Sequence, residues 1–235
     1  MTKMKLEISN IPFSKTDEKR CVTLPSRLNV SLAEEIGIHI GDGSMGIYGN
    51  TNLYSLRGHL HKDREFYDLF LKNLYERIFN IDVNLREWSD VYGFQYGSKA
   101  IINFKQNVLC LPLGPKKSIS IPSILFSKKK FLIACILGIF DTDGNIYFEK
   151  KPSDSMYPRI SINTISKPLA LQIEHILENF LRFNLSVCEV KPFKPNWSTR
   201  YDIVVRGHEN FKKWIKIIGS NHPMHKKGFK IWKNS

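Results

Sequence analysis

The chain has 235 residues, enough for one large domain or two small ones. Hydrophobic residues make up 42% and charged residues 24%, no run of 18 apolar residues occurs, and the first residues are not an apolar segment, so we expect a soluble protein without a membrane span or secretion signal. The 35 Lys and Arg residues outnumber the 22 Asp and Glu residues, and the resulting net charge of +13 is typical of proteins that neutralise phosphate groups.

The four cysteines are scattered along the chain and none has the CxxC spacing of a metal site. Cys135 lies inside an apolar run, where packing is its expected role. We therefore expect neither disulfides nor zinc, and place the protein in the cytoplasm or another reducing intracellular compartment.

Residues 1–27 are expected to form an N-terminal extension, with a short strand over 20–25. A first half follows over 28–119. Its predicted elements, from hydrophobic periodicity and turn residues, are a helix over 31–43 capped by Ser31, strands over 44–48 and 52–59, a helix over 62–79, strands over 83–88 and 91–96, and a helix over 98–109 capped by Ser98.

Three prolines and a glycine interrupt residues 111–127 and exclude a continuous helix there, and we place a linker at 120–127. A second half, 128–235, repeats the order of the first. Its predicted elements are a helix from 129, a strand over 145–150, a turn over 151–158, a strand over 159–165, a helix over 169–183, strands over 186–191 and 200–206, and a closing helix over 209–218. The sequence therefore predicts an α+β fold in which one α-β-β-α-β-β-α unit occurs twice.

Two apolar runs, SLAEEIGIHIGDG at 31–43 and FLIACILGIFDTDG at 131–144, each end in an aspartate followed by glycine. Each also carries small residues four positions apart, which are Gly37 and Gly41 in the first run and Gly138 and Thr142 in the second. A glycine inside a helix costs about 1 kcal/mol relative to alanine. Its absent side chain allows another backbone to come very close, so we expect the two helices to pack against each other.

This packing would bring Asp42 and Asp143 together at the C-terminal ends of the two helices. Crowded carboxylates at the negative ends of two helix dipoles are unfavourable unless a cation lies between them. The pair is therefore a candidate metal site.

The nine-residue stretches EIGIHIGDG (35–43) and ILGIFDTDG (136–144) resemble the LAGLIDADG motif of the homing endonucleases. Both keep the glycine at position three, the small residue at position seven and the final Asp-Gly, whereas Ile40 replaces the usual Asp at position six. The stretches LRGHLHKDREFY, GSKAIINF, GPKKSISIP and IGSNHPMHKK also resemble archaeal-type members. The resemblance implies a single chain with two pseudo-symmetric halves, motif helices at their interface, and two antiparallel four-stranded sheets that form a saddle on DNA.

The activity implied by the resemblance is site-specific cleavage of both strands of duplex DNA. Hydrolysing a phosphodiester needs an activated water and stabilised phosphate and leaving groups, which divalent metals held by carboxylates supply. Oxygen ligands suit Mg²⁺, for which Mn²⁺ could substitute. Asp42 and Asp143 are the expected ligands, each serving one strand, with the carbonyls of Gly41 and Thr142 as further ligands that the resemblance implies.

Family members place a polar and a basic residue around each scissile phosphate. For the polar residue we favour His59 and Thr164, and for the basic residue Lys99 and Arg206. Strand side chains alternate faces, so one face of each sheet can meet the major groove. The polar, long or basic candidates for this DNA contact are Ser44, Tyr48, Asn52, Tyr54, Arg57, Arg86, Gln95, Asn145, Tyr147, Arg159, Ser161, Asn163, Lys191, Lys194, Asn196 and Arg200. We expect His39 to be packed, and His222 and His225 to be solvated in the lysine-rich tail.

Two other functions fit the same fold: an intron RNA splicing maturase, and a DNA-binding regulator that no longer cleaves. Both would keep the positive charge, so charge does not separate them from the enzyme. Degenerate members tend to lose one carboxylate, and the presence of both favours the endonuclease. The expected partners are double-stranded DNA and, for the maturase, intron RNA, with a monomer as the expected state and no membrane.

Overall fold

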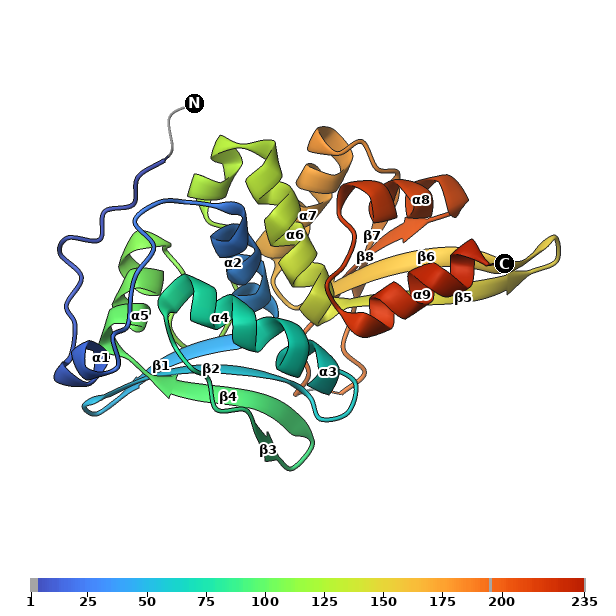
Figure 1. Cartoon of the computed structure of the whole chain (residues 1–235). Helices are drawn as coiled ribbons and strands as arrows, with labels where there is room; N and C mark the ends of the chain where they lie inside the picture. Colours follow the sequence, from blue (N-terminus) through green and yellow to red (C-terminus); the bar gives the residue numbers. More distant parts are fainter. Residues whose placement is uncertain (1–3, 195, 235) are drawn as a thin grey trace.

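The computed structural model describes residues 4–194 and 196–234 and contains two antiparallel sheets, each covered on one face by helices (Figure 1). The first half contains α2 (Val30–Asp42), β1 (Gly43–Tyr48), β2 (Thr51–His59), a helical stretch made of α3 (Arg64–Phe66), η1 (Tyr67–Leu71) and α4 (Lys72–Phe79), β3 (Arg86–Trp88), β4 (Val91–Gly97), and α5 (Lys99–Asn103) continued by η2 (Phe104–Val108). Its strand order is β1-β2-β4-β3.

The second half begins after the short helix η3 (Ser123–Ser127). It contains α6 (Lys129–Asp143), β5 (Gly144–Lys151), β6 (Asp154–Thr164), α7 (Lys167–His175) continued by η4 (Ile176–Phe180), β7 (Leu185–Val190), β8 (Arg200–Arg206), α8 (His208–Ile217) and α9 (Pro223–Lys233). The strand order β5-β6-β8-β7 is that of the first half, so the predicted fold of two similar α+β halves is confirmed. The residue boundaries of the halves stay a prediction.

The helices α2 and α6 lie side by side in the middle of the molecule (Figure 1). A Cβ atom added to Gly37 would lie 2.1 Å from the carbonyl oxygen of Cys135, and one added to Gly138 would lie 2.2 Å from that of Glu34. Neither helix could therefore approach the other as closely with alanine at these positions. The close approach expected from the two glycines is confirmed.

Each sheet buries one face against helices. Tyr54, Leu56 and Phe94 of the first sheet and Ile160 and Ile162 of the second are at most 1% exposed. The residues between them along the strands point to the opposite face, because strand side chains alternate. This leaves one face of each sheet without a helical cover (Figure 1).

Several local expectations are wrong. The cap of α2 is Asn29, which accepts a hydrogen bond from the Leu32 N–H at 2.8 Å, and not Ser31. No strand forms over 20–25, where the chain instead makes single contacts such as Thr23 N–H to the Phe79 carbonyl at 2.9 Å. The turn expected over 151–158 is a continuous hairpin, because β5 reaches Lys151 and β6 starts at Asp154.

Two α-helices were not predicted, nor was the short 3-10 helix η3 within the expected linker. The first, α1 (Lys15–Lys19), is held by a capping box in which Ser14 and Asp17 exchange hydrogen bonds, a signal present in the sequence. The second is α9, which begins with Pro223 in its first turn and is capped by His222. It lies along β5 (Figure 1) and adds a helix to the second half. Among the described helices, none is long and apolar enough to cross a membrane.

Candidate active site

The last residues of the two central helices are Asp42 and Asp143. Each helix ends in an extended glycine, so the chain turns directly into β1 or β5 and holds the carboxylate at the junction of helix and sheet. A Cβ atom added to Gly41 would lie 3.4 Å from Asp143 Oδ2, which shows that the carboxylate of α6 reaches the last turn of α2. The same Cβ would overlap Thr142 Oγ1. The helix ends are therefore packed together around the two acids.

Both acids are held in an environment that favours their neutral form. Burial, followed by the charges of Asp143 and Asp63, raises the pKa of Asp42 to about 8, against a hydrogen bond from the Tyr67 hydroxyl at 3.0 Å and the charge of Lys116, which favour the ionised form. Burial also raises the pKa of Asp143 to about 6, opposed by the charge of Lys116. A cation between the two carboxylates would relieve this cost.

The donor set fits a hard divalent cation bound partly by other ligands. Among the described residues, no group of three His, Cys, Asp or Glu side chains could hold a metal alone. Mg²⁺ is usually bound by one or two carboxylates together with waters and substrate phosphates, so two aspartates are sufficient. Asp42 and Asp143 therefore fit the ion implied by the sequence.

A basic residue that the sequence analysis missed lies at this point. Lys116 comes from the stretch between the halves, and its ammonium group donates to the carbonyl oxygens of Ile40 at 2.9 Å and of Gly41. Burial lowers the pKa of Lys116, while the charges of Asp143 and Asp42 oppose that change. The carbonyl of Gly41, expected as a metal ligand, is engaged by this lysine. The chain turns at Gly114, whose N–H donates to the Met45 carbonyl at 2.9 Å, and this turn directs Lys116 toward the end of α2. Gly114 was therefore the residue in the sequence that could have indicated the position of Lys116.

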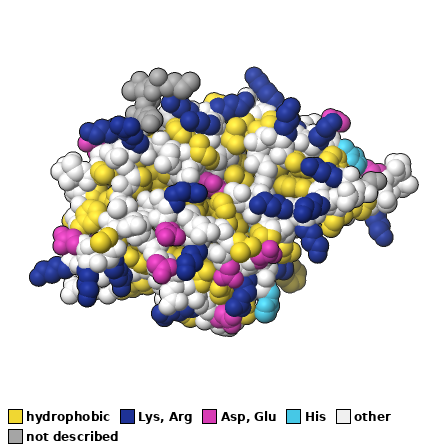
Figure 2. Space-filling model, viewed as in Figure 1, with side chains coloured by type: hydrophobic (Ala, Val, Ile, Leu, Met, Phe, Trp, Pro, Cys, Tyr) yellow, Lys and Arg dark blue, Asp and Glu magenta, His cyan; other side chains and the backbone are white. Residues whose placement is uncertain are grey.

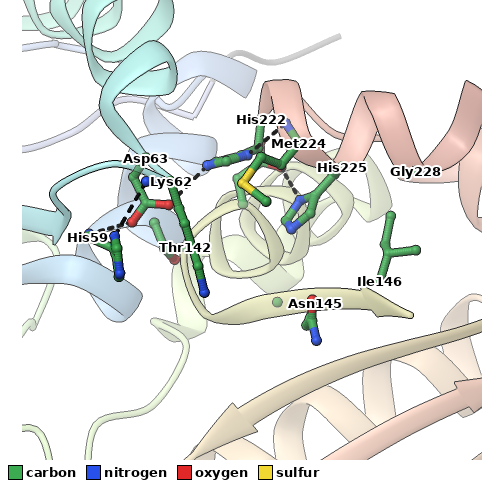
Figure 3. Close-up of a pocket in the computed structure, with 12 residues that line it drawn as sticks. His59, Lys62, Asp63, Thr142, Asn145, Ile146, His222, Met224, His225 and Gly228 are labelled. Carbon is green, nitrogen blue, oxygen red and sulfur yellow. Dashed lines mark hydrogen bonds and ion pairs between the residues drawn. The ribbon is translucent and has the colours of Figure 1, made fainter. Parts of the chain in front are cut away.

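Two cavities flank the helix ends. One, of about 270 Å³, is lined by Gly41, Lys116, Asp143, Thr164 and Arg200 among others. The other, of about 370 Å³, is lined by His59, Asp63, Thr142, Asn145 and His222 among others (Figure 3). Thr164 and His59, the predicted polar partners, thus each line a cavity next to a motif helix. Their catalytic roles stay a prediction.

The predicted basic partners lie elsewhere. Ser98, next to Lys99, donates its N–H to the Asn52 carbonyl near the tip of the β1–β2 hairpin, whereas Asp42 precedes the other end of β1. About four residues of strand separate these positions along the sheet, roughly 13 Å. Arg206 pairs with Arg159, three residues from the Ile162 that faces Gly144. Both backbone positions thus lie several residues along the sheet from the carboxylates, and the catalytic roles of Lys99 and Arg206 stay a prediction.

Most predicted DNA contacts share the uncovered face of a sheet, as the register shows. In the first sheet, Ser44 pairs with Ser55 and Ser55 with Gln95, while Arg57 and Arg86 both face Gly93. In the second sheet, Asn145 pairs with Ser161 and Tyr147 with Arg159. The set on these faces is Ser44, Tyr48, Arg57, Arg86, Gln95, Asn145, Tyr147, Arg159, Ser161, Asn163 and Arg200. Lys191, Lys194 and Asn196 are exposed on the chain between β7 and β8.

Two of these predictions are wrong. Tyr54 is fully buried and its hydroxyl bonds Tyr75 and Glu35 inside the first half, so it is unavailable to DNA. Asn52 lies two residues before Tyr54 and therefore on the same, helix-covered side of the sheet. The hairpin register places Leu53, Ser55 and Arg57 on the uncovered face instead.

Three histidines, His39, His222 and His225, are buried among other side chains. His39 is buried and stacks on Tyr54 at 5.6 Å, as expected for a packed residue, and burial lowers its pKa well below the usual value. His222 and His225 are 3% and 8% exposed, so the expectation that they are solvated is wrong. His222 bonds Asp63 of the first half at 3.2 Å (Figure 3), and His225 stacks on Phe140 at 4.3 Å.

Surface charge agrees with an anionic partner. Lys and Arg side chains are spread across the face of the molecule seen in Figure 2, in line with the net charge of +13. Counterion release from bound phosphates is the physical basis of such an interaction.

The comparisons with known proteins agree with this geometry. Residues 130–219 match the family model of the LAGLIDADG-like domain. A structure of I-DmoI in complex with DNA and Ca is similar with a TM-score of 0.58 and 15% identity, over 86% of this chain and 99% of that one. Another I-DmoI structure, with DNA and Mn, gives a TM-score of 0.54 and 17% identity, over 81% of this chain and 98% of that one.

The homing endonuclease I-WcaI bound to its DNA recognition sequence gives a TM-score of 0.55 at 14% identity, over 92% of both chains. No curated protein matches the chain. At these identities the structures establish the fold, whereas the family model rests on the sequence of the second half. The second half is thus a LAGLIDADG-like domain, and the whole chain has the two-half fold of the single-chain LAGLIDADG homing endonucleases.

Proposed function

We propose that this protein is a site-specific DNA endonuclease that hydrolyses one phosphodiester on each strand of a duplex, using a divalent cation, Mg²⁺ or Mn²⁺, held by Asp42 and Asp143. The observation that carries the proposal is the meeting of these two half-buried carboxylates at the ends of α2 and α6, between two sheets whose uncovered faces carry polar and basic side chains. The named relatives were bound to DNA in their structures, in some cases with Mn or Ca.

Each residue of the site has a distinct task. Asp42 and Asp143 would hold the cation, whose charge would favour their ionised forms. A divalent cation at this position lowers the pKa of a bound water and neutralises charge on the phosphate. Lys116, held against the end of α2, adds a fixed positive charge that stabilises the phosphate. His59 and Thr164 orient water in this proposal, which is supported by their lining the two flanking cavities.

The test compares Asp42→Asn and Asp143→Asn with the parent on a randomised duplex library whose cut ends are sequenced. Each variant should abolish double-strand cleavage, because a neutral amide is a poor Mg²⁺ ligand. Duplex affinity should hold or rise, since a negative charge near phosphates is removed. Asp82→Asn is the matched control, because the Asp82 side chain is 85% exposed.

Several results would contradict the proposal. Cleavage by either Asn variant at the parental rate would remove the acid from the mechanism. Cleavage that continues in chelator would exclude the metal. A parent that binds one duplex specifically but never cuts it would be a regulator, and tight binding to a structured intron RNA alone would indicate a maturase.

A further inference from the structure

The chain between β7 and β8 differs from its counterpart in the first half. The β3–β4 pair is closed by the two residues Ser89 and Asp90, whereas the β7–β8 pair is closed by the nine residues 191–199. Because two residues are enough to connect this pair of strands, the extra length is not needed for the fold. We call residues 191–199 the β7–β8 loop.

This loop exposes two large aromatic rings. Phe193 is 94% exposed and Trp197 is 61% exposed, and among the large hydrophobic residues described none is more exposed than Phe193. The Trp197 N–H bonds the Lys194 carbonyl at 3.0 Å, and the Lys194 ammonium lies 5.3 Å from the centre of the Trp197 ring. The tryptophan is therefore held in place by a local turn rather than by the core.

The charges of the loop fit a nucleic acid. From Lys191 to Arg200 the sequence carries Lys191, Lys194 and Arg200 and no acidic residue. The nearest acids are Glu189 and Asp202 on the flanking strands, and Asp202 pairs with Arg200 at 2.6 Å. Exposed aromatic rings between lysines are suited to contact bases while the ammonium groups contact phosphates.

The loop also lies next to the candidate catalytic centre. Val190 and Arg200, the residues that end β7 and begin β8, pair directly, and Arg200 lines the cavity that contains Asp143 and Lys116. In Figure 1 the chain between β7 and β8 runs on the side of the molecule away from α7 and α8. A duplex that presents a phosphate to Asp143 would therefore bring its bases within reach of the loop.

We propose that Phe193 and Trp197 form an aromatic wedge that inserts between base pairs of the bound duplex close to the cleaved phosphates. The wedge rests on the proposed nuclease function and adds a local unstacking of the DNA to it. Unstacking costs energy that the apolar contact with the rings offsets, and it favours sequences with easily unstacked steps at that position. The second half would thereby contribute a preference for deformable steps that the two-residue turn of the first half does not provide.

The test uses a duplex enriched by the parent from a pool with a randomised centre, in Ca²⁺ so that the DNA stays intact. The adenine analogue 2-aminopurine, whose fluorescence rises when it is unstacked, is placed at successive positions. The parent should raise the fluorescence at one or two adjacent positions near the centre. Phe193→Ala and Trp197→Ala should abolish that rise and weaken duplex binding by about 5- to 150-fold, the factor equivalent to about 1–3 kcal/mol per stacked ring.

Two controls separate a contact with DNA from a loss of structure. Because Phe193 is exposed, Phe193→Ala should leave the melting temperature unchanged, and Phe193→Trp should retain the fluorescence rise. Leu69→Ala is the matched control, since Leu69 is 65% exposed on η1 on the helix side and should bind as the parent does.

The outcomes distinguish this inference from the nuclease proposal. If both alanine variants bound the duplex and raised the 2-aminopurine fluorescence as the parent does, and still cleaved DNA, the wedge alone would be overturned. A parent that enriches no duplex would overturn both. An effect of the alanine variants on a structured RNA but not on duplex would replace the wedge by an RNA contact.

Discussion

The two halves share a strand order but are built around different interiors. In the first half, Glu35 of α2 accepts hydrogen bonds from the Lys105 ammonium and from the Tyr75 hydroxyl at 2.7 Å, all buried. In the second half, the position of Glu35 in the motif is taken by Ile136, and Phe140 packs edge-on against Trp214 at 5.0 Å. The first half thus has a buried Lys–Glu pair at this position of the motif helix, and the second half has an apolar residue there.

This difference shows which features set the fold. The glycine contacts between α2 and α6 and the strand order occur in both halves, whereas the buried Lys–Glu pair occurs only in the first. Many interiors of suitable volume can support one backbone. An ion pair without access to water is costly to break, because the remaining charge stays buried without a partner.

The largest expected effect comes from breaking the polar interior. Lys105→Met should lower the free energy of unfolding by about 3–5 kcal/mol, since it leaves Glu35 buried and unpaired. Adding Glu35→Ile, which copies the second half, should recover much of that loss. Urea denaturation measures both, with Lys72→Met as the matched control because the Lys72–Asp82 pair is exposed. If the free energy of unfolding of Lys105→Met were within about 1 kcal/mol of the parental value, the Lys105–Glu35 pair would not be buried as described.

The next effect concerns the acids at the junction of the halves. The pKa is raised to about 8 for Asp42, to about 6 for Asp143 and to about 7 for Glu34, mainly by burial. Groups with a raised pKa hold their proton more tightly in the folded state. The contribution of these acids to the free energy of unfolding is therefore fully present below pH 4 and is lost as the pH rises toward 8.

We expect the metal-free protein to lose stability from pH 4 to 8 and to regain it with Mg²⁺ or Mn²⁺. Asp42→Asn should be more stable than the parent in chelator, by an amount that grows between pH 5 and pH 8 to on the order of 2 kcal/mol or more. Glu34 lies far from the end of α2, and Glu34→Gln should instead flatten the dependence of stability on pH between about pH 4.5 and 7. A parent whose stability rises over this range in chelator would contradict the assigned burial of the acids.

The smallest effect compares the two uncovered sheet faces. Arg57 stacks on Trp88 at 4.8 Å, whereas Arg159 is paired with Glu149. Arg57→Ala should weaken duplex binding and reduce the slope of log K against log[salt] by about one, because one phosphate contact is lost. Arg159→Ala should change the slope less, since Glu149 already offsets its charge. Binding titrations at several salt concentrations measure both, and an unchanged slope for Arg57→Ala would remove it from the phosphate contacts.

Much of the fold and the two acids could be predicted from local patterns. The spacing of Gly37 and Gly138 from the terminal aspartates recurs in both halves, so the meeting of the helices followed from steric reasoning. Ser98 was identified correctly as a cap because its preference is local.

Other features depend on the path of the chain in space. Lys116 lies 27 residues before Asp143 in sequence, and only the fold of the chain between the halves brings it to the helix ends. The face of Asn52 and Tyr54 was misjudged because a strand shifted by one residue exchanges its two faces. His222 and His225 are in a lysine-rich tail that reads as solvated, but α9 packs that tail against Phe140 and Asp63.

Anomalous scattering from Mn²⁺ in crystals of the protein with its enriched duplex would locate the cation that we propose Asp42 and Asp143 hold. We expect an anomalous peak within bonding distance of a carboxylate oxygen of Asp42 or Asp143 and of a DNA phosphate oxygen. The corresponding Asn variant should lose that peak while the duplex stays bound. Peaks only at other side chains, such as His222 and His225, with cleavage intact in Mn²⁺, would contradict the account.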